Sequence, residues 1–220
     1  MPETPPLAHA EPAARAADHE TPRTADRLAM ERMVLFTDAV FAIVITLLAL
    51  EIRLPESAFA SEQALRHGLS EVLAKVMAYV ISFLVTALFW AGHLRKFRHI
   101  HALHRRLVAF NLLHLMVIGL MPFATGLLSE TGLPLTVMIY AGVQCLAVLT
   151  SWLTRAWASA HPALLHPGVG EPERRIERRV HGVAFVVFAA SIGLATFGNV
   201  AMLSWLLLWP GLTWARRPSA

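Results

Sequence analysis

The 220-residue sequence has few charged side chains and almost no cysteine. Asp, Glu, Lys and Arg make up 15% of it, whereas 56% of its residues are hydrophobic and the mean hydropathy is +0.54. Soluble domains need more polar surface than this, so the composition predicts an integral membrane protein. The single Cys145 excludes an intrachain disulfide and leaves the redox compartment open.

The common catalytic motifs are also missing. The sequence contains no H-E-x-x-H, no G-x-S-x-G and no pair of carboxylates in a catalytic arrangement, so we expect no enzyme and no cofactor. The net charge of +4 comes with arginines beside apolar runs, which favours membrane topology over nucleic-acid binding. Four histidines lie close together in the sequence: His93, His99, His101 and His104. Their neighbours are basic and no cysteine or carboxylate joins them, which argues against a metal site.

Long apolar runs dominate the rest of the chain. About 20 apolar residues are enough for a helix to cross the roughly 30 Å hydrocarbon core of a bilayer. Residues 1–27, rich in Pro, Ala and Glu, are too polar to pack and are expected to form a disordered cytoplasmic tail. An all-α domain at 28–215 follows, and its spans are expected at about 33–53, 72–93, 107–128, 133–153, 180–197 and 200–214.

The segments between these spans differ in length and in turn residues. Polar connectors are expected at 55–70, with a short helix near 62–69, and at 154–179. Pro122 predicts a kink near Ile118, because proline removes one helix hydrogen bond. Spans five and six come from a single apolar block, which we divide at its only turn signal, Gly198-Asn199.

The distribution of arginine supports an even number of spans. Basic residues gather before span one, after spans two and four, and at the chain end, while the alternate connections hold few. By the positive-inside rule, both termini of this multi-pass protein are expected to lie in the cytoplasm, with the protein in the cell membrane. The cytoplasmic groups include Arg32, Arg98, Arg106, Arg155, Arg175, Arg178 and Arg217.

The first span carries an acid, Asp38, near its start. A membrane-embedded carboxylate is costly and requires a partner, for which Arg32, Trp90, His93 and Asn111 are the candidates. Alternatively, His93 is not a partner of Asp38 and lies in water at the membrane interface.

Three stripes divide this helix at 100° per residue. Small residues (Ala39, Ala42, Thr46, Ala49) suit close helix packing. Bulky residues on the far side are expected to face lipid or loosely packed neighbours: Phe41, Val44, Ile45, Leu48 and Ile52. The third stripe consists of Phe36, Val40, Ile43, Leu47 and Leu50, and periodicity alone leaves its neighbour open.

A motif in this span resembles a known family. Arg32-x-x-x-Phe36-Thr37-Asp38 is similar to the first-span signature, Arg-x-x-x-Phe-Ser-Asp, of the transmembrane protein 175 family of potassium channels. Thr37 departs from the signature but keeps a hydroxyl. The resemblance covers roughly residues 30–215 and includes further matches at Trp90, His93, Asn111, Pro122 and Phe123.

The resemblance implies a fold and a function. It implies six transmembrane helices per subunit and a homotetramer in which the first helix of each copy lines a pore for K⁺. It assigns the narrow part of that pore to Ile43, Leu47 and Leu50, and a structural role to the polar residues of the motif. On spacing alone, this i, i+4, i+7 stripe is more typical of ordinary helix packing.

Selectivity is expected to be modest. The sequence has no Thr-Val-Gly-Tyr-Gly-like segment that would form a ring of carbonyl ligands. Hydrophobic rings would instead gate the pore and make ions shed water, with the Thr46 hydroxyl at the rim of the constriction. A secondary transporter or proton pathway through Asp38, His93 and His114 is the alternative, although these residues lie near span ends rather than at the midplane.

Overall fold

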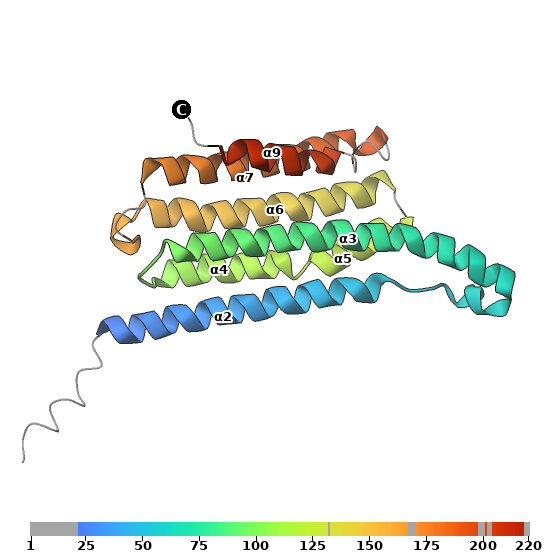
Figure 1. Cartoon of the computed structure of the whole chain (residues 1–220), viewed down its shortest axis with the longest axis horizontal. Coiled ribbons are helices and arrows are strands. Elements are labelled where there is room, and N and C mark those ends of the chain that lie inside the picture. The colour runs from blue at the N-terminus through green and yellow to red at the C-terminus, as the bar shows by residue number, and fades with distance from the viewer. Residues whose placement is uncertain (1–21, 132, 167–169, 198–200, 202–203, 218–220) are drawn as a thin grey trace, which may run out of the picture.

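The computed structural model describes residues 22–131, 133–166, 170–197, 201 and 204–217. Within these ranges the protein is a bundle of roughly parallel and antiparallel helices arranged in layers, with α2 at one side and α7 and α9 at the other (Figure 1). Its α-helices are α2 (Pro22–Leu48), α3 (Glu62–Arg98), α4 (Arg105–Ile118), α5 (Met121–Thr131), α6 (Pro134–Ser159), α7 (Glu171–Leu194) and α9 (Leu208–Ala215).

Short 3₁₀ turns complete these elements: η1 (Ala49–Glu51), η2 (Glu56–Ala60), η3 (Pro162–Leu164), η4 (Ala195–Phe197) and η5 (Trp205–Leu207). The first helix begins at Pro22, so residues 22–27 are helical rather than part of a disordered tail. The remainder of the predicted tail, residues 1–21, lies outside the described residues.

The helix that contains the predicted second span starts ten residues before residue 72, at Glu62. Helix α3 is continuous over 37 residues, and the Ser61 side chain caps it by accepting a hydrogen bond from the Ala64 N–H at 3.1 Å. At 1.5 Å per residue it is about 55 Å long, so its polar first turns extend beyond a hydrocarbon core of about 30 Å. The separate short helix predicted near 62–69 is therefore wrong.

The third span is interrupted where Pro122 predicts. Helix α4 ends at Ile118 and α5 begins at Met121. Proline has no N–H to donate to the Ile118 carbonyl, and its ring would press on that carbonyl in a regular helix. Gly119 and Leu120 close the end of α4 with backbone hydrogen bonds to Leu115 (2.9 Å) and Val117 (3.0 Å).

Helices α6 and α7 are both longer than predicted, at the expense of the loop expected at 154–179. Helix α6 continues to Ser159, and α7 starts at Glu171, where Glu173 accepts a hydrogen bond from the Gly170 N–H at 3.0 Å. The loop that remains pairs with the loop after α3, because the His101 N–H donates to Leu164 O (3.0 Å). The loops after α3 and α6 therefore lie at the same end of the bundle.

Five of the described helical segments are long and apolar enough to cross a membrane: 26–51, 62–98, 105–131, 134–159 and 171–197. Helix α9 lies in the predicted sixth span, and its eight residues are about 12 Å long. The split at Gly198-Asn199 lies outside the described residues, so the number of six spans stays a prediction.

Two hydrophobic clusters hold the bundle together. The larger combines buried side chains of every described α-helix, η4 and η5, including Phe41, Leu48, Met121, Tyr140 and Phe188. The smaller lies at the end that holds the paired loops and includes Met30, Phe97, Ile100 and Leu107.

A buried polar chain crosses the larger cluster. Thr125 donates to Ser82 (2.8 Å), and Ser82 donates to the Tyr140 hydroxyl (3.2 Å). These two bonds connect α5, α3 and α6 where their side chains have no access to solvent. Satisfying such groups avoids the cost of leaving a polar atom unpaired in an apolar interior.

Candidate functional site

Helix α2 is anchored in the bundle by one face. Phe41, Val44 and Leu48 are almost fully buried, and they pack in the larger hydrophobic cluster. This corrects the prediction that the far side of the helix meets lipid or loose neighbours. The i, i+3, i+7 spacing of the three residues places them on one line along the helix, against the other elements of the bundle.

The third stripe of α2 is largely exposed in the part of the chain that the structure describes. Ile43 is 58% exposed, Leu47 41% and Leu50 55%, and Phe36 is exposed above them, while Val40 is half-buried. From Ile43 to Leu50 the stripe rises about 10 Å along the helix axis. The small residues Ala39, Ala42, Thr46 and Ala49 are exposed beside it.

Thr46 is the one hydroxyl-bearing residue in this exposed region. Its Oγ1 donates a hydrogen bond to the Ile43 carbonyl of its own helix at 2.8 Å. The hydroxyl proton is therefore occupied, and the oxygen keeps both lone pairs as acceptors. A cation approaching the stripe near Ile43 would meet an acceptor at this position.

A polar junction holds α2 near its middle, at Thr37 and Asp38. The Trp90 indole N–H of α3 donates to the Asp38 carboxylate at 2.9 Å. Asn111 of α4 donates to Thr37 Oγ1 at 2.8 Å, and Thr37 in turn donates to the Met33 carbonyl at 2.9 Å. Thr37 and Asn111 are buried. The hydroxyl at position 37 both donates and accepts, which a serine hydroxyl does equally well.

Of the four candidate partners of Asp38, Trp90 is the one that bonds it in the described structure, because Asn111 donates to Thr37 and the other two lie elsewhere. Arg32 is exposed and makes no ion pair with Asp38. His93 is fully buried, so it is not an interfacial histidine in water either. Its ring lies 4.4 Å from that of Phe97 and 6.2 Å from that of Phe41, and neither ring nitrogen has a hydrogen-bond partner among the described residues.

His114 of α4 has its hydrogen-bond contact with α6 rather than with Asp38 or His93. Its Nδ1 is 2.9 Å from the Thr150 hydroxyl, and its ring is 6.2 Å from that of Phe41. No hydrogen bond joins Asp38, His93 and His114 in the described part of the chain, so the three do not form a continuous proton relay there.

The other histidines of the basic segment are dispersed. The His101 ring packs on that of His166 and the His104 ring on that of Trp157, while His99 Nδ1 lies 4.0 Å from Glu177. In the described ranges, no three His, Cys, Asp or Glu side chains are grouped closely enough to hold a metal ion.

A second polar cluster was missed at the sequence level. Lys96 of α3 is buried and donates to Ser151 of α6 at 2.9 Å, and Ser151 Oγ is 3.2 Å from His181 of α7. Beside them, Arg155 Nε is 2.6 Å from Glu177 Oε2. The N–H does not point at this oxygen, so the contact is an ion pair rather than an aligned hydrogen bond. The basic residues were interpreted only as topology signals.

The arrangement of α2 can now be set beside known proteins. The sequence profile of a family described as the endosomal/lysosomal potassium channel TMEM175 matches residues 32–122. A Streptomyces collinus protein named as a potassium channel is 33% identical over 174 residues, which cover 74% of this chain and 81% of that protein. The chain belongs to the TMEM175 family. The resemblance carried by the Arg32 to Asp38 motif is thereby confirmed.

Other TMEM175 relatives are more distant or larger. Human TMEM175, named as an endosomal/lysosomal proton channel, is 27% identical over 190 residues, which cover 81% of this chain but 36% of the human protein. A crystal structure described as a lysosomal potassium-selective channel TMEM175 homologue from Chamaesiphon minutus matches with a TM-score of 0.70 at 22% identity. That match covers 86% of this chain and 99% of the other, and at this identity it shows the shared fold alone.

Membership of the TMEM175 family agrees with the helices described above. The chain is a multi-pass membrane protein of a channel family, not of an enzyme family. The family profile begins at Arg32 and so includes the whole exposed stripe of α2 and the polar junction.

Proposed function

We propose that the chain forms a potassium-permeable channel as a homotetramer, with α2 of each copy around the central pore. The observation that carries this proposal is the division of α2 into two apolar faces. The face with Phe41 and Leu48 is buried in its own subunit, whereas Ile43, Leu47 and Leu50 remain largely exposed among the described residues. Family membership makes other copies the natural neighbours of that stripe.

In a ring of four copies, Ile43, Leu47 and Leu50 would stack as three apolar rings about 10 Å deep. Such a constriction excludes water when narrow and forces a passing ion to lose part of its hydration shell. K⁺ holds its water less strongly than Na⁺ and therefore passes more readily. The Thr46 oxygen, close to the Ile43 level, offers one compensating contact, so discrimination is expected to be modest.

Ion flux tests this function directly. Purified protein in liposomes should pass K⁺ down a gradient, and an equal Na⁺ gradient should drive slower flux. Absence of flux with either cation would refute the channel.

A proton pathway is the competing function. The human relative is named a proton channel, and His93 and His114 hold ring nitrogens without partners in the described residues. Against it, Phe41 packs against both rings and no hydrogen bond bridges them. If protons alone crossed the liposome membrane, with neither K⁺ nor Na⁺ flux, the proton pathway would replace the channel for K⁺.

Asp38→Ala is expected to reduce the yield of assembled protein more than it changes selectivity. The substitution leaves the Trp90 N–H without its acceptor and loosens the α2–α3 junction, a loss of roughly 1 to 3 kcal/mol. Trp90→Phe should act similarly, and the double variant should cost little more than either single one. Size-exclusion chromatography in detergent measures assembly. Normal assembly with altered ion preference would place Asp38 in the pore.

The proposed topology places both termini in the cytoplasm. Arg98 and Arg175 lie next to the paired loops at one end of the bundle, and Glu62 begins α3, which ends at that same Arg98. Single cysteines at these positions, in a Cys145→Ser background, should react with an impermeant thiol reagent from outside only at position 62. External labelling at position 175 would contradict the topology.

A further inference from the structure

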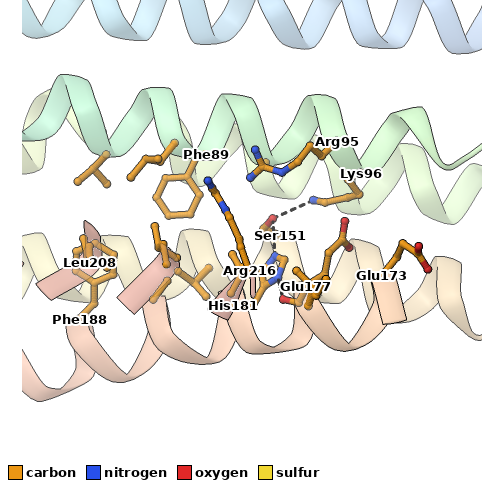
Figure 2. Close-up of a pocket in the computed structure, with 18 of the residues that line it drawn as sticks. Phe89, Arg95, Lys96, Ser151, Glu173, Glu177, His181, Phe188, Leu208 and Arg216 are labelled. Carbon is orange, nitrogen blue, oxygen red and sulfur yellow. Dashed lines mark hydrogen bonds between the residues drawn. The ribbon is translucent and has the colours of Figure 1, made fainter. Parts of the chain in front are cut away.

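A groove of about 250 Å³ lies on the side of the subunit away from α2. Helix α3 forms one wall and α7 with α9 the other, and Val148 and Ser151 of α6 form the floor. Figure 2 shows side chains from both walls pointing into the space between them.

The two ends of the groove differ in chemistry. One end is apolar and is lined by residues such as Phe89, Phe188 and Leu208. The other end is polar, and Arg95 and Lys96 of α3 face Arg216, which follows α9 (Figure 2). The groove is therefore amphipathic along its length.

The polar end has more positive than negative charge available. The guanidinium groups of Arg95 and Arg216 have no hydrogen-bond or ion-pair partner among the described residues, and the two charges are close enough to repel one another. Glu177 is engaged by Arg155 at 2.6 Å, and Glu173 accepts the hydrogen bond from Gly170 at the start of α7. The lining therefore holds three basic side chains and two carboxylates, and Glu177, which also attracts Arg95, is shared with Arg155.

The length and position of the groove match one leaflet of a bilayer. Along α3 its lining extends from Val85 to His99, about 21 Å, compared with about 15 Å for half of a hydrocarbon core. Trp214, one turn from the polar end, is exposed and lies beneath Arg179 at 6.0 Å. Tryptophan is enriched at the headgroup level of membranes, which places the cationic end there.

We propose that this groove binds an anionic phospholipid from the surrounding leaflet. The phosphate lies between the Arg95 and Arg216 guanidinium groups, which present forked N–H donors suited to phosphate oxygens. One acyl chain lies along the apolar end, beside Phe89 and Phe188. The lipid adds negative charge where basic side chains outnumber carboxylates and fills the space that separates α3 from α7.

The amphipathic lining favours a lipid over a free anion. A free phosphate would use only the cationic end and leave the apolar end unfilled. A neutral lipid would fill the apolar end but would not relieve the repulsion between the two arginines. An anionic phospholipid satisfies both ends with one molecule.

Two variants with matched controls test the site. Arg95→Gln with Arg216→Gln removes the two cations, and Arg98→Gln with Arg217→Gln removes the same charge from exposed positions outside the groove. Gly92→Leu fills the groove from α3. The Gly92 Cα has room, since an added Cβ would meet nothing closer than Arg95 at 3.8 Å, and leucine favours the helix.

Native mass spectrometry counts the lipid retained by the full-length protein after incubation with dioleoyl phosphatidylglycerol or dioleoyl phosphatidylcholine. We expect the wild type and the Arg98/Arg217 control to retain phosphatidylglycerol preferentially. The Arg95/Arg216 variant should bind it about tenfold more weakly, because each surface cation contributes measurably to the binding of anionic lipid. Gly92→Leu should lose it as well, with an unchanged helical circular dichroism spectrum.

Three results would overturn the proposal. The first is equal retention of phosphatidylglycerol by the Arg95/Arg216 variant and its control. The second is displacement of the bound lipid by glycerol phosphate at matched concentration, which would make the site one for a free anion. The third is unchanged lipid binding in Gly92→Leu.

Discussion

Replacing Ile43 with asparagine is expected to raise conductance and to bring K⁺ and Na⁺ towards equal permeability. Four amide side chains at the proposed narrowest ring would hold water and offer oxygens to either cation. The dehydration step that disfavours Na⁺ would then disappear. Currents or fluxes measured in liposomes under paired K⁺ and Na⁺ gradients give both quantities from the same preparation.

Ile45→Asn is the matched control for this variant. Ile45 is two positions further along α2, close to the opposite side of the helix, and is half-buried against its own subunit. This change should leave selectivity unaltered and lower stability at most. The opposite pattern, with discrimination intact in Ile43→Asn and lost in Ile45→Asn, would show that another surface lines the pore.

Loss of the Glu177 carboxylate is expected to have the largest effect on stability. Arg155 is 5% exposed, and Glu177 Oε2 lies 2.6 Å from its Nε. Glu177→Ala leaves the guanidinium buried without its counter-charge, and breaking a buried ion pair in this way costs about 3 to 5 kcal/mol. The α6–α7 packing should weaken, which thermal unfolding in detergent would register as a lowered Tm.

Two further variants test whether the loss of the ion pair causes the lowered Tm of Glu177→Ala. Glu173→Gln changes an exposed carboxylate one turn earlier in α7, and its amide can still accept from Gly170, so Tm should hardly change. The double variant Arg155→Met with Glu177→Leu should recover most of the loss, because apolar pairs often replace buried ion pairs at little cost. A double variant no more stable than Glu177→Ala would show that the charge pair itself is not the cause.

The sequence predicted the class of fold because its main signals are local. Apolar length predicted long helices, five of which are long and apolar enough in the described residues to cross a membrane, and Pro122 predicted the break between α4 and α5. The polar residues after Ser61 suggested a connector, yet nothing between Glu62 and Arg98 prevents a continuous helix. Hydropathy detects the part of a helix that lies in lipid, not the turns that project beyond it.

The faces of α2 show why burial was harder to predict. In a membrane protein, lipid is as apolar as the protein interior, so a bulky stripe suits either environment. For this reason the sequence pattern predicts that Phe41 and Leu48 face lipid or loosely packed neighbours, whereas both are buried in the bundle. Asp38 was different, because an acid restricts its partners to few donors, and Trp90 was among those named.

The groove site had no signal in the linear sequence. Arg95, Ser151, Glu177 and Arg216 come from four separate helices or their ends, and each is unremarkable among its sequence neighbours. Only the packing of α7 and α9 beside α3 brings them together. The prediction for His93 was wrong for a different reason. A polar residue in an apolar span suggested a hydrogen bond with Asp38, whereas the His93 ring packs against that of Phe97.

Block of K⁺ flux by a thiol reagent tests most directly whether the exposed stripe of α2 lines the pore. In a Cys145→Ser background, cysteine at position 47 should react with a bulky, positively charged methanethiosulfonate added to the liposomes, and flux should stop. Cysteine at Leu35, which is exposed on α2 but outside the stripe, should be labelled without loss of flux. Full labelling of position 47 with undiminished K⁺ flux would contradict the pore proposed here.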